Sequence, residues 1–227
     1  LYLGLATITR LEEAAHRRWF TALSVLLVVQ VLVILASAFQ RLLLYENAYG
    51  WTVLRTITHF FIIWLALLLL AAIVLELLRR RHHFGLAALI FAVGFGLTLG
   101  LLNVDGFIAQ RNLQRARAGL ELDASYLAAL SSDAVPTLID EYLRPDITKT
   151  VKDALGAELA CRTEAFKTQP QRDWRGYNLS EASAQALIAR NQASWSQYPV
   201  TGSGRKVTVN VGGQEKSCLF GTRLELD

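Results

Sequence analysis

Three long runs with almost no charge constrain this chain more than any other feature of its sequence. Residues 19–39 and 84–104 carry no charged side chain, and residues 57–78 carry only Glu76, close to the end of the run. At 1.5 Å per residue, a helix over each run is long enough to cross the ~30 Å hydrocarbon core of a bilayer. A helix buried in a large soluble core would normally show a polar stripe at helical spacing, which all three runs lack. The sequence therefore predicts three transmembrane helices.

The charge distribution agrees with this prediction. Of the 227 residues, 53% are apolar, which is high for a soluble domain. Residues 1–104 carry eight Arg and four Glu, whereas residues 105–227 carry fifteen Lys plus Arg and fifteen Asp plus Glu, so the net charge of +4 belongs to the first part. Positive charge beside apolar spans favours anionic lipid. We therefore expect the lipid bilayer, and not nucleic acid, as a partner.

The arginines also predict an orientation. Cytoplasmic loops of membrane proteins are enriched in Lys and Arg. Only Arg41 and Arg55 lie in the connection between the first two spans, whereas six arginines precede the first span or follow the second: Arg10, Arg17, Arg18, Arg79, Arg80 and Arg81. This bias predicts a cytoplasmic amino end and a carboxyl-terminal domain outside, although three arginines beyond the third span oppose it. The chain begins with Leu1 and contains no methionine, so we expect more protein, with further spans, before it.

Beyond Asp105 the pattern becomes that of a soluble, mostly helical region. Asp123, Asp133, Asp146 and Ser180 are expected to cap helices. After Tyr198 the sequence alternates in "RKVTVNV", turns at "GG" and returns in "QEKSCLF", with "RLEL" as a third candidate strand. We predict a mainly α protein with a membrane domain (1–104), a small helical extramembrane domain (105–197) and a short β-hairpin (198–227).

A few polar or small residues interrupt the spans. Gly96 and Gly100 form a G-x-x-x-G pair, a spacing that allows a second helix to approach closely. Gln30 lies near the middle of the first span and is expected to hydrogen-bond a neighbouring helix. His59 and Glu76 are the ionisable groups of the second span, and with Gln30 they are the candidates for a polar path.

The connection between the first two spans is predicted to be an interfacial hinge. Its aromatic rings suit the headgroup level, its arginines suit phosphates, and its glycine suits a turn. The residues of this hinge are Arg41, Tyr45, Glu46, Tyr49, Gly50, Trp51 and Arg55. A carboxylate beside anionic lipid is unfavourable unless it is paired, so Glu46 is expected to pair with Arg41, Arg55 or Arg175.

Motifs for catalysis, metals and cofactors give no candidate. "RRRHH" at 79–83 is a charge anchor, because adjacent histidines do not share a helix face and no Cys or carboxylate stands at ligand spacing. "TGSGRKVT" lacks the spacing of a phosphate loop and precedes a strand. Since all four histidines lie before residue 84, Ser-His and Cys-His chemistry in the carboxyl-terminal part is excluded. We expect no catalytic site, metal or cofactor.

Two features of the carboxyl-terminal part point to contacts. Asp173, Trp174, Arg175 and Tyr177 are a cluster of residue types that dominate protein interfaces, although Trp174 could equally cover a hydrophobic core. Cys161 and Cys218 lie in the region that this topology sends to an oxidising compartment, where a disulfide can form. Two unpaired small side chains are the equal alternative.

Four stretches in order, "LYENAYGWTVLRTITHFFIIW", "LLNVDGFIAQRNLQRA", "LDASYLAALSSDAVPTL" and "DWRGYNLSEA", resemble a family of bacterial integral membrane proteins. This family is the domain-of-unknown-function 4173 type, which is related to the 4153 type. The resemblance runs from about Arg41 to Ala189. It implies a multi-pass bacterial membrane protein that ends in a short helical domain and has no established activity. Together with the arginine bias, this predicts a protein of the bacterial inner membrane with that domain on the periplasmic side.

Two functions are compatible with these features. The first is a non-catalytic accessory or scaffolding subunit, with other membrane subunits as partners. The second is a sensor or transporter component with a polar path near Glu76, His59 and Gln30.

Overall fold

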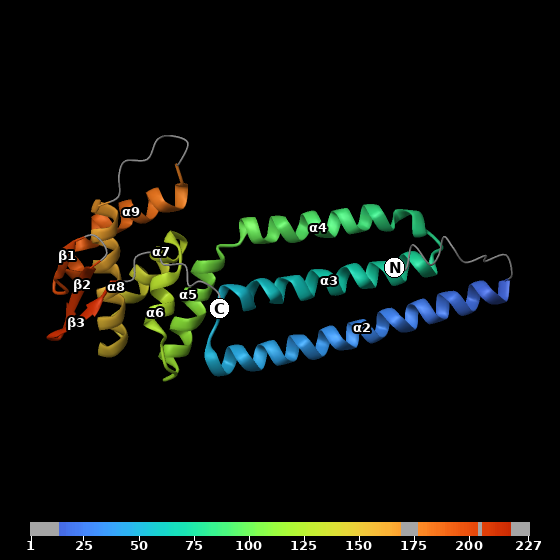
Figure 1. Cartoon of the computed structure of the whole chain (residues 1–227), viewed down its shortest axis with the longest axis horizontal. Coiled ribbons are helices and arrows are strands. Elements are labelled where there is room, and N and C mark those ends of the chain that lie inside the picture. Colours follow the sequence, from blue (N-terminus) through green and yellow to red (C-terminus); the bar gives the residue numbers. More distant parts are fainter. Residues whose placement is uncertain (1–13, 169–176, 204–205, 219–227) are drawn as a thin grey trace. The chain divides into compact units, whose positions relative to one another are not determined.

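The structure, a computed structural model of the chain, describes residues 14–168, 177–203 and 206–218. It divides into two compact units, Leu1–Leu102 and Asn103–Asp227 (Figure 1). The first holds three long apolar helices; the second holds shorter helices and a three-stranded antiparallel sheet. The predicted fold class is confirmed.

The membrane unit consists of α2 (Ala14–Tyr49), α3 (Val53–Leu77) and α4 (Phe84–Leu101), with a short 3-10 turn, η1 (Arg81–His83), before α4. All three helices are long and apolar enough to cross a membrane. In Figure 1, α3 lies between the other two, and it packs against both. Among the described residues, α2 and α4 are not a packed pair, so this unit is an open layer with α3 in the middle.

The first helix is longer than its predicted span. The uncharged run predicts a span that ends at Phe39 and a loop over residues 41–55, but α2 continues to Tyr49. The residues after Phe39 are mostly good helix formers, and no breaker occurs before Gly50. Gly50 adopts a φ of 88°, which suits glycine, and Thr52 caps α3 by accepting a hydrogen bond from the backbone N–H of Arg55. The loop is thus a tight turn.

The second unit begins with α5 (Val104–Arg117), α6 (Ala124–Ala129) and α7 (Val135–Tyr142), and continues with α8 (Lys149–Thr168) and α9 (Leu179–Asn191). Two 3-10 turns, η2 (Ser132–Ala134) and η4 (Gln192–Trp195), precede α7 and follow α9. The apolar faces of the helices in this unit meet in one core. Its largest fully buried apolar side chains are Ile108, Leu113, Leu127, Val135, Leu138, Leu155, Leu159, Trp195 and Val209.

Helix caps in this unit agree with the sequence in part. Asp133 was expected to be a cap, but it lies inside η2, which Ser131 caps, and no side chain caps α7. Asp123 caps α6 as predicted, accepting a hydrogen bond from the backbone N–H of Tyr126. The cap of α9 is Asn178 and not Ser180, because the amide oxygen of Asn178 accepts hydrogen bonds from the first backbone N–H groups of the helix. Asp146 was expected to cap α8, but its carboxylate pairs with Arg144, and α8 begins three residues later.

The sheet comprises β1 (Val200–Ser203), β2 (Lys206–Val211) and β3 (Gln214–Ser217), with β2 in the middle. Val200 pairs with Val209, and Thr208 with Ser217. The predicted Gly-Gly turn is present, since Gly212 and Gly213 both have positive φ. The predicted third strand, residues 223–226, lies outside the described residues; the third strand of this sheet is β1.

The sheet rests on α8. Val207 and Val209 of β2 are buried, and α8 contacts both β1 and β2. The ring of Tyr198 lies so close to Gly156 of α8 that a methyl group at position 156 would overlap it. A disulfide joins Cys161 of α8 to Cys218, which follows β3. The sheet is therefore held to the helices by packing and by a covalent bond.

Candidate functional site

A buried carboxylate and a buried imidazole meet near the turn between α2 and α3. Glu46 lies in the last turn of α2 and His59 in the second turn of α3, and their side chains are 1% and 8% exposed. A hydrogen bond of 2.8 Å joins Oε1 of Glu46 to Nδ1 of His59. A buried carboxylate is costly without a partner, so this contact explains how Glu46 is accommodated.

Aromatic rings enclose this pair. The ring of Phe39 meets the imidazole edge-on at 4.7 Å between centroids, and the ring of Trp51 stacks on it at 5.7 Å. Nε2 of His59 is buried and has no hydrogen-bond partner among the residues that the structure describes. A carboxylate next to an imidazole can share and exchange a proton. Within the described ranges, no three His, Cys, Asp or Glu residues lie close enough to hold a metal ion.

The structure adds a partner that the sequence did not predict. Glu46 was expected to pair with Arg41, Arg55 or Arg175; its carboxylate hydrogen-bonds His59, and Arg55 interacts with it electrostatically. The guanidinium of Arg55 donates to the carbonyl oxygen of Gly50 at 2.8 Å and so closes the turn. Arg41 is exposed on α2, and Arg175 lies outside the described residues.

A second polar contact ties the other end of the same two helices. The hydroxyl of Thr21 on α2 donates to Oε1 of Glu76 on α3 at 2.8 Å, and Arg81 forms an ion pair with the same carboxylate. The guanidinium of Arg81 also lies over the ring of Phe20, 5.3 Å from its centroid. Glu76 is only 6% exposed. We call these two contacts the turn clamp (Glu46–His59) and the end clamp (Thr21–Glu76–Arg81).

The three residues of the predicted polar path are not brought together. His59 and Glu76 lie near opposite ends of α3 and belong to different clamps. Gln30 is exposed on α2, and no described residue hydrogen-bonds its amide. Among the described residues, no continuous chain of polar groups links them.

The predicted glycine pair faces open space. A methyl group placed on Gly96 or Gly100 would meet nothing within 4 Å, whereas one on Gly94 would overlap the indole of Trp64. Gly94 is therefore the glycine that allows α4 to approach α3. Gly96 and Gly100 lie on a face that neither α2 nor α3 covers.

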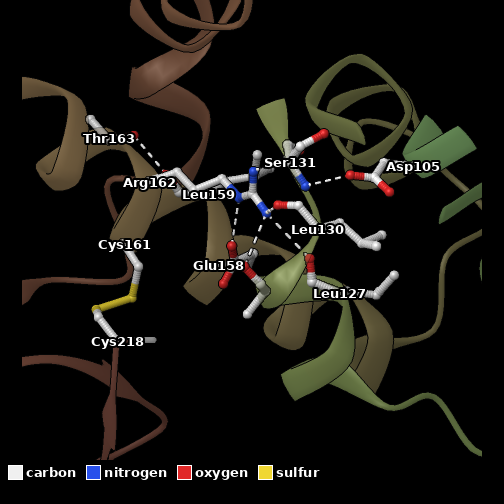
Figure 2. Close-up of polar contacts among 11 residues, drawn as sticks. Asp105, Leu127, Leu130, Ser131, Glu158, Leu159, Cys161, Arg162, Thr163 and Cys218 are labelled. Atoms are coloured by element: carbon white, nitrogen blue, oxygen red, sulfur yellow. Dashed lines mark hydrogen bonds and ion pairs between the residues drawn. A yellow bond between two sulfur atoms is a disulfide. The ribbon is translucent and has the colours of Figure 1, made fainter. Parts of the chain in front are cut away.

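The second unit has its own polar centre, which the sequence analysis missed. Arg162 of α8 directs its guanidinium to the carboxyl end of α6 (Figure 2). Nη2 donates to the carbonyl oxygens of Leu127, Ala128 and Leu130, and Nε donates to Glu158 at 2.6 Å. A cation at a helix carboxyl end satisfies the last carbonyls and complements the dipole. This arrangement is structural, and it fixes α6 on α8.

Four titrating groups of the second unit, Arg117, Arg144, Asp146 and Tyr198, are shifted by burial or by neighbours. Burial raises the pKa of Tyr198, and the hydrogen bond that its hydroxyl donates to Asp153 at 2.8 Å adds to the increase. The hydrogen bond to Glu141 raises the pKa of Arg117. The hydrogen bond from Arg144 lowers the pKa of Asp146. The causes of these shifts are burial and contacts within the second unit.

The predicted partner cluster is only partly described. Asp173, Trp174 and Arg175 lie outside the described residues, and Tyr177 is 68% exposed just before α9. The disulfide, which the sequence left open, is present.

Comparison with known proteins gives one match. A family model described as a domain of unknown function (DUF4153) matches residues 1–141, which include the three spans and α5 to α7 up to Glu141. Neither a curated protein nor a solved structure matches. The 4173 type named in the sequence analysis is not the family found, so that assignment stays a prediction, whereas the related 4153 type is found. Because the match covers more than half of the chain, this membrane protein belongs to the DUF4153 family.

Proposed function

We propose that this protein is a non-catalytic accessory or scaffolding subunit of a larger assembly in the bacterial inner membrane. In this role, its spans pack against other membrane helices, and its second unit contacts a partner on the periplasmic side. Glu46, His59 and Glu76 hold the hairpin of α2 and α3 together. The uncovered faces of the membrane helices remain available for contact with a partner.

The observation that carries this proposal is the open faces of the membrane unit. In this layer α4 is an outer helix, and the small residues that allow close helix approach, Gly96 and Gly100, lie on its side away from α3. Large side chains on α4 such as Leu89, Val93 and Leu97 are more than half exposed. A face that combines small residues with exposed apolar ones suits contact with another helix.

The orientation rests on the arginine bias and on the disulfide. Disulfides persist in oxidising compartments, so a bond between Cys161 and Cys218 favours a periplasmic second unit. Labelling tests this part directly. In intact cells, a membrane-impermeant thiol reagent should reach a single cysteine introduced at exposed Leu120, with Cys161 and Cys218 kept as a disulfide. Reaction only after the cells are opened would place the unit in the cytoplasm.

The test of the assembly is copurification. The full chain is solubilised in a mild detergent and compared with a variant that carries Gly96→Leu and Gly100→Leu, which fills the open face. We expect other membrane proteins to copurify with the native chain and to be lost from the variant, while both chains remain folded. If the chain is isolated without any other protein, as a monomer or as an oligomer of itself, the scaffolding proposal is wrong.

A second candidate function is a membrane sensor, favoured by the buried Glu46–His59 pair. The pair lies beside the turn that joins α2 to α3, and its hydrogen bond links the two helices. In this role, a proton or ligand that opens the turn clamp would shift α2 against α3. His59→Gln, which keeps a neutral hydrogen-bonding group, should then abolish a pH-dependent change in protease sensitivity that the native chain shows. If the protease sensitivity of the native chain does not depend on pH, the sensor proposal is wrong.

A further inference from the structure

Basic side chains gather at the end of the α2–α3 hairpin that lies opposite its turn. Four arginines with described side chains belong to this end: Arg18 at the start of α2, and Arg79, Arg80 and Arg81 after α3. The acidic side chain described at this end is Glu76, and it forms an ion pair with Arg81. Among the described residues, no carboxylate pairs with the other three arginines. We call Arg18, Arg79 and Arg80 the basic end.

The end clamp brings these three arginines to one level. Thr21 hydrogen-bonds Glu76, and α2 and α3 run in opposite directions, so the turn of α2 before Thr21 lies beside the residues that follow Glu76. Arg18 stands three residues before Thr21, on the same side of α2. Arg79 and Arg80 stand three and four residues after Glu76. All three arginine side chains are exposed, so they form one basic surface across two helices.

Arg79 has a backbone conformation that favours glycine. Its φ is 57°, and it ends α3 in a turn in which the backbone N–H of Arg80 donates to the carbonyl oxygen of Leu75 at 2.8 Å. Glycine is the usual residue at this position of a helix end, because other residues adopt it at a cost in free energy. An arginine at this position therefore indicates a use for its side chain.

The surroundings of the basic end match the level of lipid headgroups. The uncharged run of the first span begins at Trp19, directly after Arg18, and Trp19 is 70% exposed, as expected for an interfacial indole. The run of the second span ends directly before Arg79, and its last two residues, Leu77 and Leu78, are both 62% exposed. A phospholipid can place its phosphate on the arginines and an acyl chain on these leucines. A soluble anion can do only the first.

We propose that Arg18, Arg79 and Arg80 form a binding site for the phosphate headgroup of an anionic phospholipid. Basic groups between neighbouring spans are suited to such headgroups. Each guanidinium donates through a planar fork that matches the oxygens of a phosphate. The bound lipid joins the start of α2 to the end of α3, and so stabilises the hairpin next to the end clamp.

Thermal unfolding of the full chain in detergent tests this site. Phosphatidylglycerol, which is anionic, should raise the unfolding temperature more than an equal concentration of phosphatidylcholine, which has no net charge. Arg18→Gln and Arg80→Gln should each weaken the apparent affinity for phosphatidylglycerol roughly fivefold, the effect of one basic residue beside an anionic lipid. Arg41→Gln is the matched control, because Arg41 is an exposed arginine of α2 at the other end of the span.

Three results would overturn the proposal. The first is an equal effect of the two lipids on the native chain. The second is a loss of affinity in Arg41→Gln as large as in Arg18→Gln and Arg80→Gln, because any exposed arginine would then serve. The third is equal stabilisation by inorganic phosphate at the same concentration, which would assign the basic end to soluble anions.

Arg79→Gly separates lipid binding from the stability of the fold. Glycine suits a φ of 57°, so without added lipid this variant should unfold at a higher temperature than the native chain. Its affinity for phosphatidylglycerol should nevertheless fall roughly fivefold. A purely structural role of Arg79 would not move these two measurements in opposite directions. Native affinity in Arg79→Gly would overturn the assignment of this residue to the site.

The lipid site is independent of the scaffolding proposal. A chain isolated without any other protein would disprove the scaffold and could still prefer phosphatidylglycerol. An assembly whose members copurify, but whose stability does not depend on the lipid headgroup, would support the scaffold and overturn the site.

Discussion

His59 Nδ1 lies 2.8 Å from Glu46 Oε1, and this contact joins the last turn of α2 to the second turn of α3. The two residues are thirteen positions apart, on either side of a turn that Gly50 and Thr52 make possible. The contact buries a carboxylate and an imidazole within a shell of aromatic rings. It fixes the position of α3 along the axis of α2.

Removing one partner of the turn clamp should destabilise the protein more than removing both. Glu46→Ala or His59→Ala alone leaves the other group buried without its partner, which costs about 3 kcal/mol. The double variant Glu46→Leu, His59→Leu should recover most of that loss. Thermal unfolding of the full chain in detergent measures the three effects. If the effects of the single variants simply add up, the two side chains do not interact.

Arg162 should be among the most sensitive residues of the second unit. Arg162→Ala leaves the last carbonyls of α6 and the Glu158 carboxylate without their donor, and we expect a loss of about 2 to 3 kcal/mol in unfolding free energy. Arg162→Lys should recover only part, since an ammonium cannot reproduce the planar fork of donors. Arg190→Ala, an exposed arginine of α9, is the control. Hydrogen exchange of the α6 amides locates the effect, and unchanged exchange would contradict it.

Tyr198 should make the second unit sensitive to alkali. Because burial raises the pKa of its hydroxyl, the folded chain keeps the proton at pH values where the unfolded chain has lost it. The unfolding free energy should therefore stay constant below the ordinary value of 10 and fall as the pH rises above it. Denaturant unfolding between pH 8 and 11 measures this slope.

Two variants separate Tyr198 from other titrating groups. Tyr198→Phe should flatten the slope and, through loss of the hydrogen bond to Asp153, lower the unfolding free energy at neutral pH by about 1 kcal/mol. Tyr177→Phe, which alters an exposed ring, should retain the native profile. An unchanged slope in Tyr198→Phe would assign the alkaline sensitivity elsewhere.

The disulfide should contribute strongly to the stability of the sheet. It joins residues 57 positions apart, and a loop of that length corresponds to about 4 kcal/mol in the chain-entropy description. Replacing Cys161 and Cys218 together by serine should expose β1 to β3 to protease first, because the sheet is held to α8 by this bond and a small apolar contact. Proteolysis followed by mass measurement identifies the first cut. A first cut elsewhere, at an unchanged rate, would show that packing alone holds the sheet.

The fold could be predicted largely because its signals are local. The length of an uncharged run predicts a span, and Gly212–Gly213 between alternating residues predicts a hairpin turn. The cap at Asp123 could be predicted because its residue type and its position before a helical segment are enough to indicate an N-cap. The end of α2 was misjudged because polar and aromatic residues after Phe39 are typical both of an interface and of a helix end that projects beyond the hydrocarbon.

The contacts between helices could not be predicted in the same way. A sequence gives the face on which a residue lies but not the register between two helices, so Arg55 was as plausible a partner for Glu46 as His59 was. The G-x-x-x-G spacing predicted that helices pack at Gly96 and Gly100, yet the glycine that lies against the indole of Trp64 is Gly94. Arg162 donates mainly to backbone carbonyl groups. Because every residue has such a group, no residue type in the sequence indicates these partners.

The positions of the two clamps also bear on how the membrane unit is made. Glu46 and Glu76 are each buried by a partner that lies on, or next to, the other helix of the hairpin. A carboxylate that enters lipid without its partner faces a large barrier. During biosynthesis, α2 is therefore expected to wait at the translocon until α3 has emerged from the ribosome, so that the two helices leave for the bilayer as one hairpin.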